Sequence, residues 1–167
     1  HVRNLEALQQ KVSARATAEL AQSLSSSVAG RSGEDALRCV AHAYRDYALG
    51  HRGRYPLTQR VPDPSDPAHV AAGEQAVQAM FAALRGYGIE GDEAIHATRA
   101  ARSVLHGFVS LEIDGGFGLP QDVGCSFERL VSVLHVSLTR WSQVVRDQAL
   151  LAPKPPNEVG SPADTVV

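Results

Sequence analysis

The chain has 167 residues, of which 44% are hydrophobic, and it carries a formal net charge of −2. A chain of this length fits one domain with a sizeable core, and no run of 18 apolar residues predicts a membrane span. The slightly acidic charge argues against direct binding of a phosphate backbone. The only two cysteines, Cys39 and Cys125, indicate reduced thiols in the cytoplasm rather than a disulfide-bonded secreted fold.

The two ends of the chain differ from its middle. The chain opens at His1 rather than at a methionine, so we expect that residues preceding it are missing. Residues 149–167 hold four prolines and few large apolar side chains, which predicts a disordered tail. We therefore assign residues 1–148 to one domain, in which residues 1–8 form the junction from a missing N-terminal part.

Apolar residues recur every three or four positions along most of the chain, which is the period of an α-helix. In the first helix this pattern holds from Leu5 to Val28, and glycines end it. Ser32 and Asp35 have the spacing of a capping box, which predicts the start of a second helix. The second helix extends to about Gly50, where the apolar pattern stops.

A proline-rich loop, residues 54–67, follows the second helix and has room for at most one short helix. Asp66 and Pro67 form a good N-cap and first helical position, so a third helix begins there and ends at Gly86 to Gly88. No stretch alternates in polarity as a β-strand does. The sequence therefore predicts an all-α fold with five long or medium helices and one possible short helix.

The last two predicted helices, residues 92–114 and 122–148, each have two neighbouring apolar stripes. In the fourth helix one stripe consists of Ile95, Leu105, Val109 and Ile113, and the other of Val104, Phe108 and Leu111. In the fifth helix the main stripe is Phe127, Leu130, Leu134, Leu138, Trp141 and Val145, widened by Val133, Val136 and Val144. Such an arc is too broad for a helix on the surface of a monomer. These two helices are therefore central, or one face of them contacts another subunit.

Gly107 lies in the middle of the fourth helix, where alanine would be about 1 kcal/mol more favourable. Ser103, Gly107 and Ser110 lie within about 60° on one side of that helix, and small side chains let another helix approach closely. The helix that approaches this side of the fourth helix belongs either to the same chain or to a partner subunit. We expect the neighbouring His106 to be a hydrogen-bonded core or interface residue.

Three segments resemble motifs of the TetR family of transcriptional repressors, in its C-terminal ligand-binding and dimerisation domain. "HVRNLEAL" is similar to the Tyr-x-His-Phe/Val-x-x-Lys-x-x-Leu segment of that family, with His1, Val2 and Leu8 matching and Leu5 in place of Lys. "RAARSVLHGFVSLEIDGGFG" is similar to a Trp-x-x-x-His-Gly-x-x-x-Leu-Glu segment, with His106, Gly107, Leu111 and Glu112 matching and Arg102 in place of Trp. "HRGRYPLTQ" resembles a His/Asn-Pro-x-x-Tyr loop, with Arg52 in place of Pro.

The resemblance implies a homodimer in which the last two helices pair with those of the partner to form a four-helix bundle. We assign the interface to Leu105, His106, Gly107, Val109, Ile113, Leu134, Leu138 and Trp141. The operator DNA would be bound only through an N-terminal helix-turn-helix head that is missing from this chain, so none of its residues is expected to contact DNA. No membrane partner is implied.

The resemblance further implies a small, mostly apolar effector, bound among the other helices. We expect its pocket to be lined by Tyr44, Tyr47, Met80 and Phe81, with the loop 54–67 bordering the entrance. Effector binding would shift the first helix and so change the spacing of the two DNA-reading heads, which releases the operator.

Two other functions are compatible with the sequence. The chain could be a helical protein-interaction module that dimerises without any effector. It could instead be an enzyme built on a helical bundle, because Cys39 and His42 lie three residues apart, as a thiol nucleophile and its base require. We find no complete catalytic motif and no pair of histidines at metal-ligand spacing, so we expect no enzyme activity, no cofactor and no metal.

Overall fold

The computed structural model describes residues 5–151 and the side chains of residues 5–147. Within this range the chain is helical throughout, as predicted, with the elements α1 (Leu5–Val28), α2 (Gly33–Gly50), the 3₁₀ helix η1 (Tyr55–Gln59), α3 (Pro67–Arg85), α4 (Gly91–Ile113), α5 (Val123–Thr139) and α6 (Trp141–Leu151). None of the described helices is both long and apolar enough to cross a membrane.

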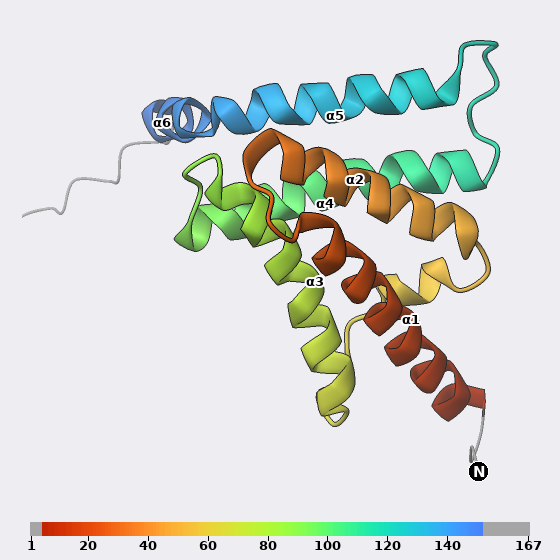
Figure 1. The fold of residues 1–167 in the computed structure, drawn as a ribbon. Coiled ribbons are helices and arrows are strands. Elements are labelled where there is room, and N and C mark those ends of the chain that lie inside the picture. Colours follow the sequence, from red (N-terminus) through yellow and green to blue (C-terminus); the bar gives the residue numbers. More distant parts are fainter. Residues whose placement is uncertain (1–4, 152–167) are drawn as a thin grey trace, which may run out of the picture.

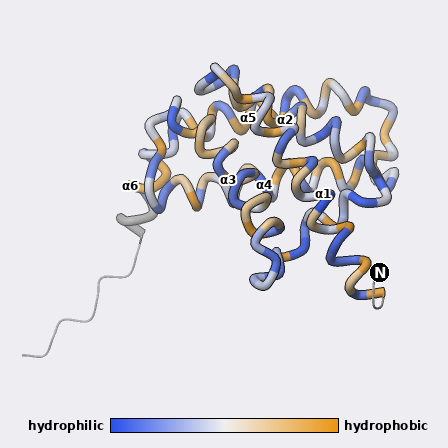
Figure 2. Tube along the Cα trace, turned by 60° about the horizontal axis from the view of Figure 1, so that its bottom comes forward, coloured by the Kyte–Doolittle hydropathy of each residue, from blue (hydrophilic) through white to orange (hydrophobic). Residues whose placement is uncertain are grey.

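The helices form two groups that meet along α2. In Figure 1, α4 and α5 run side by side and are joined by a long loop at one end, and α2 packs against both of them. On the other side of α2, helices α1 and α3 pack closely against each other, and η1 contacts α1. In Figure 2, hydrophobic and hydrophilic positions follow each other at short intervals along the helices, as amphipathic helices require.

One continuous core joins the two groups of helices. Its largest fully buried side chains include Leu37 of α2, Leu84 of α3, Leu105 of α4 and Phe127 of α5. Each such side chain contributes about 1.5–3 kcal/mol by leaving water. The helices that carry the broad apolar stripes are therefore central within the single chain.

Local signals explain most of the helix ends. The Asp66 carboxylate accepts hydrogen bonds from the backbone N–H groups of Ala68 and His69, which confirms the predicted N-cap of α3. The capping box predicted at α2 has the right N-cap position, but its hydrogen bonds are not formed. Ser32 is the N-cap residue, but its side chain makes no cap hydrogen bond, and Asp35 pairs with Arg31 at 3.2 Å.

The start of α2 and the end of α3 touch through their backbones. Gly33 has a φ of +58°, a conformation that side chains disfavour. A Cβ atom built on Gly86 would lie 2.0 Å from the backbone nitrogen of Gly33, so a side chain at residue 86 cannot fit without movement of the backbone. This contact fixes the start of α2 against the end of α3.

The predicted single helix from residue 122 to 148 is wrong, because the structure has two helices with a break at Arg140. Thr139 Oγ1 donates to the carbonyl of His135, a local hydrogen bond that bends helices. The indole nitrogen of Trp141 donates to Glu93 Oε2 of α4 at 2.8 Å, which holds the start of α6 against another helix. In Figure 1, α6 accordingly turns away from the axis of α5.

The predicted boundary between domain and tail is also corrected. Helix α6 continues to Leu151, so residues 149–151 are helical rather than part of a disordered tail. Residues 152–167, and the motif positions His1 and Val2, lie outside the described residues.

Candidate effector cavity

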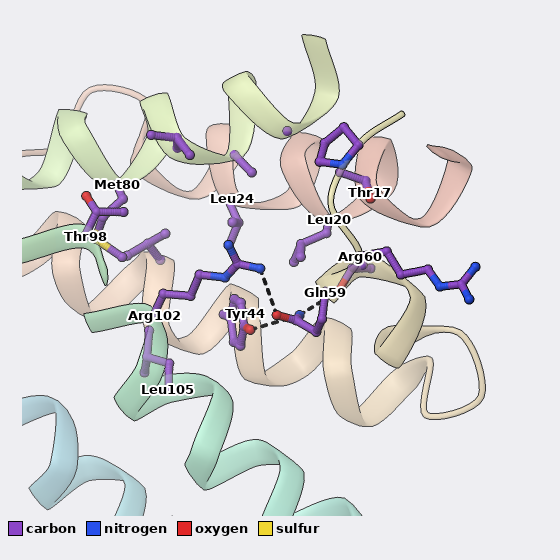
Figure 3. A pocket seen from close by; sticks show the side chains of 16 residues that line it. Thr17, Leu20, Leu24, Tyr44, Gln59, Arg60, Met80, Thr98, Arg102 and Leu105 are labelled. Carbon is purple, nitrogen blue, oxygen red and sulfur yellow. Dashed lines mark hydrogen bonds between the residues drawn. The ribbon is translucent and has the colours of Figure 1, made fainter. Parts of the chain in front are cut away.

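A cavity of about 120 Å³ lies among α1, α2, η1, α3 and α4 (Figure 3). Most of its wall is apolar and consists of Leu20, Leu24, Val40, Pro62, Ala76, Val77, Met80 and Leu105. Three wall residues, Arg60, Val77 and Arg102, are exposed, so the cavity reaches the protein surface. A concave, mainly apolar site with a few polar groups has the character of a small-molecule pocket.

Two polar side chains of α4 enter the wall from the same face of the helix. Thr98 and Arg102 are four residues apart, which places them as neighbours on a helix. Arg102 Nη2 donates to Gln59 Oε1 at 3.0 Å. Thr98 Oγ1 is buried and has no hydrogen-bond partner within the described part of the chain.

From Gln59, a chain of hydrogen bonds leads away from the cavity into the core. Gln59 Nε2 donates to the Tyr44 hydroxyl at 3.3 Å, and the hydroxyls of Tyr44 and Tyr55 are 2.8 Å apart. The Tyr55 hydroxyl lies 2.6 Å from Nδ1 of His106. If each group donates to the next, the chain ends on an unprotonated Nδ1 of His106.

Burial determines the protonation of this hydrogen-bond chain. Removal from water raises the pKa of the Tyr44 and Tyr55 hydroxyls above the ordinary value. The same removal from water, with the nearby charge of Arg102 as a second cause, lowers the pKa of His106. At neutral pH the tyrosines are therefore protonated and the imidazole is neutral, which is the state that the hydrogen-bond chain requires.

Two of the four predicted pocket residues line this cavity and two do not. Tyr44 and Met80 are in its wall. Tyr47 is not, because its hydroxyl donates to the Ala16 carbonyl at 2.9 Å and so joins α2 to α1. Phe81 packs against the core outside the wall.

Sequence reasoning missed most of the polar wall residues, namely Thr17, Thr58, Gln59, Arg60, Thr98 and Arg102. Four members of the wall, including Pro62, come from the loop 54–67, which was expected at the entrance. The one sequence feature that could have indicated a polar wall residue is Arg102, which stands where the similar family motif has tryptophan.

Most of the predicted interface residues belong to the core of the single chain. Leu105 and Val109 are 1% and 0% exposed, and Leu134 and Leu138 are also buried, so they leave almost no surface for a partner. His106 is half-buried and bonds inward to Tyr55. Ile113 and Trp141 are partly buried against the core of their own chain.

Gly107 differs from the other seven predicted interface residues, because it is exposed and a Cβ built on it meets nothing within 4 Å. No helix of the described residues therefore crosses at Gly107. In the second apolar stripes, Phe108 is partly buried against the core, whereas the other five residues are exposed, namely Val104 and Leu111 on α4, Val133 and Val136 on α5, and Val144 on α6. We call these five residues and Gly107 the outer apolar face.

The glutamate of the His-Gly motif has a structural role. Glu112 of α4 forms an ion pair with Arg45 of α2, in which both side chains are mostly buried. The Arg45 guanidinium also lies 4.9 Å above the ring of Phe127 on α5. This cluster of side chains joins α2, α4 and α5.

The cysteine and histidine considered for an enzyme do not form a catalytic pair. Cys39 Sγ donates to Asp35 Oδ1 at 3.8 Å, whereas His42 Nε2 lies 2.9 Å from Glu128 Oε1 on α5. Each side chain is thus engaged with a different carboxylate. Among the residues with described side chains, no group of three histidine, cysteine or acidic side chains could hold a metal ion.

Comparison with known proteins identifies relatives over most of the chain. The family model described as "Tetracyclin repressor-like, C-terminal domain" matches residues 37–134. The uncharacterized HTH-type transcriptional regulator Rv0681 of Mycobacterium tuberculosis is 40% identical over 116 residues, which cover 69% of this chain and 53% of that protein. The uncharacterized HTH-type transcriptional regulator YobS of Bacillus subtilis is 32% identical over 125 residues, or 74% of this chain and 64% of that protein.

The chain thus spans between about half and two thirds of the length of these two relatives. Solved structures share the fold. The protein described as "putative regulatory protein SCO4313" has a TM-score of 0.62 with 24% identity, covering 77% of this chain and 72% of its own. A protein of unknown function from Rhodococcus sp. RHA1 has a TM-score of 0.62 with 21% identity, covering 84% of this chain and 74% of its own. Because the family model and the two regulators match, the chain belongs to the TetR family of transcriptional regulators and not to an enzyme family, and it corresponds to the C-terminal domain of that family.

Proposed function

We propose that the chain is the effector-binding and dimerisation domain of a cytoplasmic TetR-family repressor, in which a small molecule in the cavity causes release of operator DNA. The observation that carries this proposal is that α1 and α4 share the wall of the cavity. Thr17, Leu20 and Leu24 of α1 face Thr98, Arg102 and Leu105 of α4 across it. A ligand between them therefore acts on the position of α1.

The energetics of such a switch are modest. A ligand changes a two-state equilibrium only by the difference in its affinity for the two states. Coupling between an effector and DNA typically amounts to about 1–3 kcal/mol and is reciprocal. A ligand that fits the cavity in only one position of α1 supplies such a difference, because several apolar contacts with α1 are made or lost together.

The outer apolar face supports dimerisation through α4 and α5. It includes Leu111 of α4 and Val133 of α5, which are 51% and 64% exposed, and the open backbone of Gly107 on α4. Such residues on two adjacent helices fit a symmetric four-helix contact with a second copy of the chain. The small residue at position 107 would let the partner helix approach closely.

Sedimentation equilibrium tests the dimer. Val133→Glu is expected to produce a folded monomer, because a charge at this exposed position opposes a partner helix but not the core. Val131→Glu is the matched control, two residues away and fully buried, and it should instead unfold the chain. A wild-type chain that stays monomeric at micromolar concentrations would contradict the proposal.

The coding sequence upstream of the codon for His1 tests the role in transcription. A segment that predicts three short helices of a helix-turn-helix head, ending in Tyr and one further residue before His1, would support it. A different domain at this place would overturn the repressor assignment. The chain would then be an interaction module, in which the outer apolar face binds a protein partner.

A further inference from the structure

The charges in the cavity wall are all of one sign. Among its sixteen residues are two arginines, Arg60 and Arg102, and neither aspartate nor glutamate. The chain as a whole carries a net charge of −2, so this wall is cationic in an acidic protein. An apolar cavity edged only by positive charge favours an anionic ligand over a neutral or cationic one.

Arg102 is the arginine placed to bind such a ligand. In Figure 3 its guanidinium lies between Leu24 and Gln59, whereas the head of Arg60 extends away from Arg102. Arg102 donates to the neutral amide oxygen of Gln59 and, within the described residues, belongs to no ion pair. A guanidinium has five N–H donors, so several remain for a carboxylate.

Thr98 gives a second, independent indication of a ligand. Its hydroxyl oxygen is buried without a hydrogen-bond partner in the described structure, and Thr98 is in the cavity wall. Buried polar groups are almost always paired, with protein groups or with ordered water, so a hydrogen-bond partner for the Thr98 hydroxyl would be stabilising. Since Thr98 precedes Arg102 by one helical turn, the two side chains present donors along the same face of α4.

The size of the cavity limits the ligand. A cavity of about 120 Å³ is slightly smaller than the apolar cavity of about 150 Å³ that holds benzene in another protein. The apolar part of the ligand therefore has about five or six carbon atoms. Of the two arginines in the wall, only Arg102 has its guanidinium between Leu24 and Gln59, since the head of Arg60 extends away from it. Arg102 therefore compensates a single negative charge, and a second charge on the ligand would remain unpaired at high cost.

We propose that the cavity binds a small monocarboxylate, with its carboxylate on Arg102 and the Thr98 hydroxyl and its short apolar body against Leu20, Leu24 and Met80. This proposal rests on the proposed function, since it names the chemical class of the effector. Binding moves the carboxylate into hydrogen-bond contact with α4 while its body packs against α1 and α3. The ligand thus supplies a hydrogen-bond partner to the Thr98 hydroxyl, which has none among the described residues.

Isothermal titration calorimetry of the chain with hexanoate, hexan-1-ol and hexylammonium tests the charge. The three probes share a chain of six carbon atoms, the first of which carries the oxygen or nitrogen head group, and they differ in the charge of that head group. Hexanoate is expected to bind most tightly and hexylammonium most weakly. Equal binding of hexan-1-ol and hexanoate would overturn the carboxylate assignment and leave the effector cavity intact. Binding of none of the three to the folded chain would count against both proposals.

Variants of the two polar residues locate the contact. Arg102→Gln should weaken hexanoate binding roughly tenfold or more, which is the worth of one charge-assisted hydrogen bond, and leave hexan-1-ol binding unchanged. The matched control is Arg99→Gln, an exposed arginine of the same helix outside the wall, which should leave hexanoate binding unchanged. An equal loss of hexanoate affinity in both variants would show that overall surface charge, and not a contact with Arg102, attracts the carboxylate. That result would overturn the assignment of Arg102.

Thr98→Val separates ligand binding from a structural role. The variant removes a buried unpaired hydroxyl, so the melting temperature of the free chain should rise, while the affinity for hexanoate should fall several-fold. A purely structural threonine would change stability without changing the preference for hexanoate over hexan-1-ol. Unchanged hexanoate affinity in this variant would remove Thr98 from the proposed site.

Discussion

Arg45 of α2 and Glu112 of α4 form a bidentate ion pair, in which Arg45 Nε donates to Oε2 at 2.8 Å and Nη2 donates to Oε1. The two side chains are only 18% and 15% exposed. Hydrogen bonding to Glu112 raises the pKa of Arg45 above the ordinary value, so the arginine stays charged. The pair holds together the two helices that flank the core, and it accounts for the glutamate of the His-Gly motif.

A double-mutant cycle with Arg45→Met and Glu112→Gln measures this pair. The coupling free energy is expected to be about 1–3 kcal/mol, because a shielded bidentate pair exceeds a surface pair in strength. Urea unfolding of the four proteins gives the value. The exposed pair Arg15–Glu19 on α1 is the control, with an expected coupling below about 0.5 kcal/mol. Additive effects of the two core substitutions would contradict the prediction.

Tyr55→Phe should destabilise the chain more than Tyr47→Phe. The Tyr55 hydroxyl joins Tyr44 and His106, so its removal breaks two hydrogen bonds and, among the described residues, leaves Tyr44 bonded only to Gln59 and His106 Nδ1 only to Ser110, at 3.4 Å. The expected loss is about 1–3 kcal/mol of unfolding free energy. The Tyr47 hydroxyl has a single backbone acceptor, at Ala16, and its loss should be near 1 kcal/mol. Urea midpoints of the two variants compare them directly, and an equal loss would count against the hydrogen-bond chain.

Acid should weaken the fold through His106. Burial lowers the pKa of this imidazole below 6.5, so the unfolded chain binds its proton more readily than the folded chain. The contribution of neutral His106 is therefore complete above about pH 7 and is lost as the pH falls through 6.5 and below. Urea unfolding of the wild type and of His106→Gln between pH 5 and 8 should show a shallower pH dependence in the variant. Parallel curves would exclude His106 as the titrating group.

Gly107→Ala should have opposite effects on the folding and the association of the chain. Alanine is worth about 0.5–1 kcal/mol over glycine in a helix, and a Cβ at this position meets no atom of its own chain. Unfolding measured at concentrations where the chain is monomeric should show this gain. Sedimentation equilibrium should show a weaker dimer, because the methyl group keeps a partner helix at a distance. A dimer of unchanged strength would place position 107 outside the interface.

Short-range signals carried the prediction of the helices. The Asp66–Pro67 cap and the glycines after Val28 and Arg85 act within a few residues of where they stand, so they can be recognised in the sequence. The break before α6 depends instead on Trp141 reaching Glu93, 48 residues away in the chain. No local pattern contains that contact, and the apolar period alone continues through Arg140.

The candidate site was predicted less well for two physical reasons. Residues Val109 and Leu111 are both apolar and lie two positions apart, yet one is fully buried and the other half exposed. Periodicity shows that α4 has two stripes, but the side of the helix that the core occupies depends on where α2 and α5 pack. The cavity wall is likewise assembled from five helical elements, so residues such as Gln59 become recognisable only once those elements meet.

The backbone contact between Gly33 and Gly86 lies five residues beyond the end of α1 at Val28 and restrains the connection that joins α1 to the rest of the domain. The helix has 24 residues and is therefore about 36 Å long. In the proposed switch, a ligand that pushes on Leu20 or Leu24 would tilt the helix about its buried end near Val28, against the hydrogen bonds of Ser13 to Leu57 and of Tyr47 to Ala16. A tilt of about 5° moves the free end near Leu5 by about 3 Å. The part of the chain least held by the core is thus the part that moves furthest.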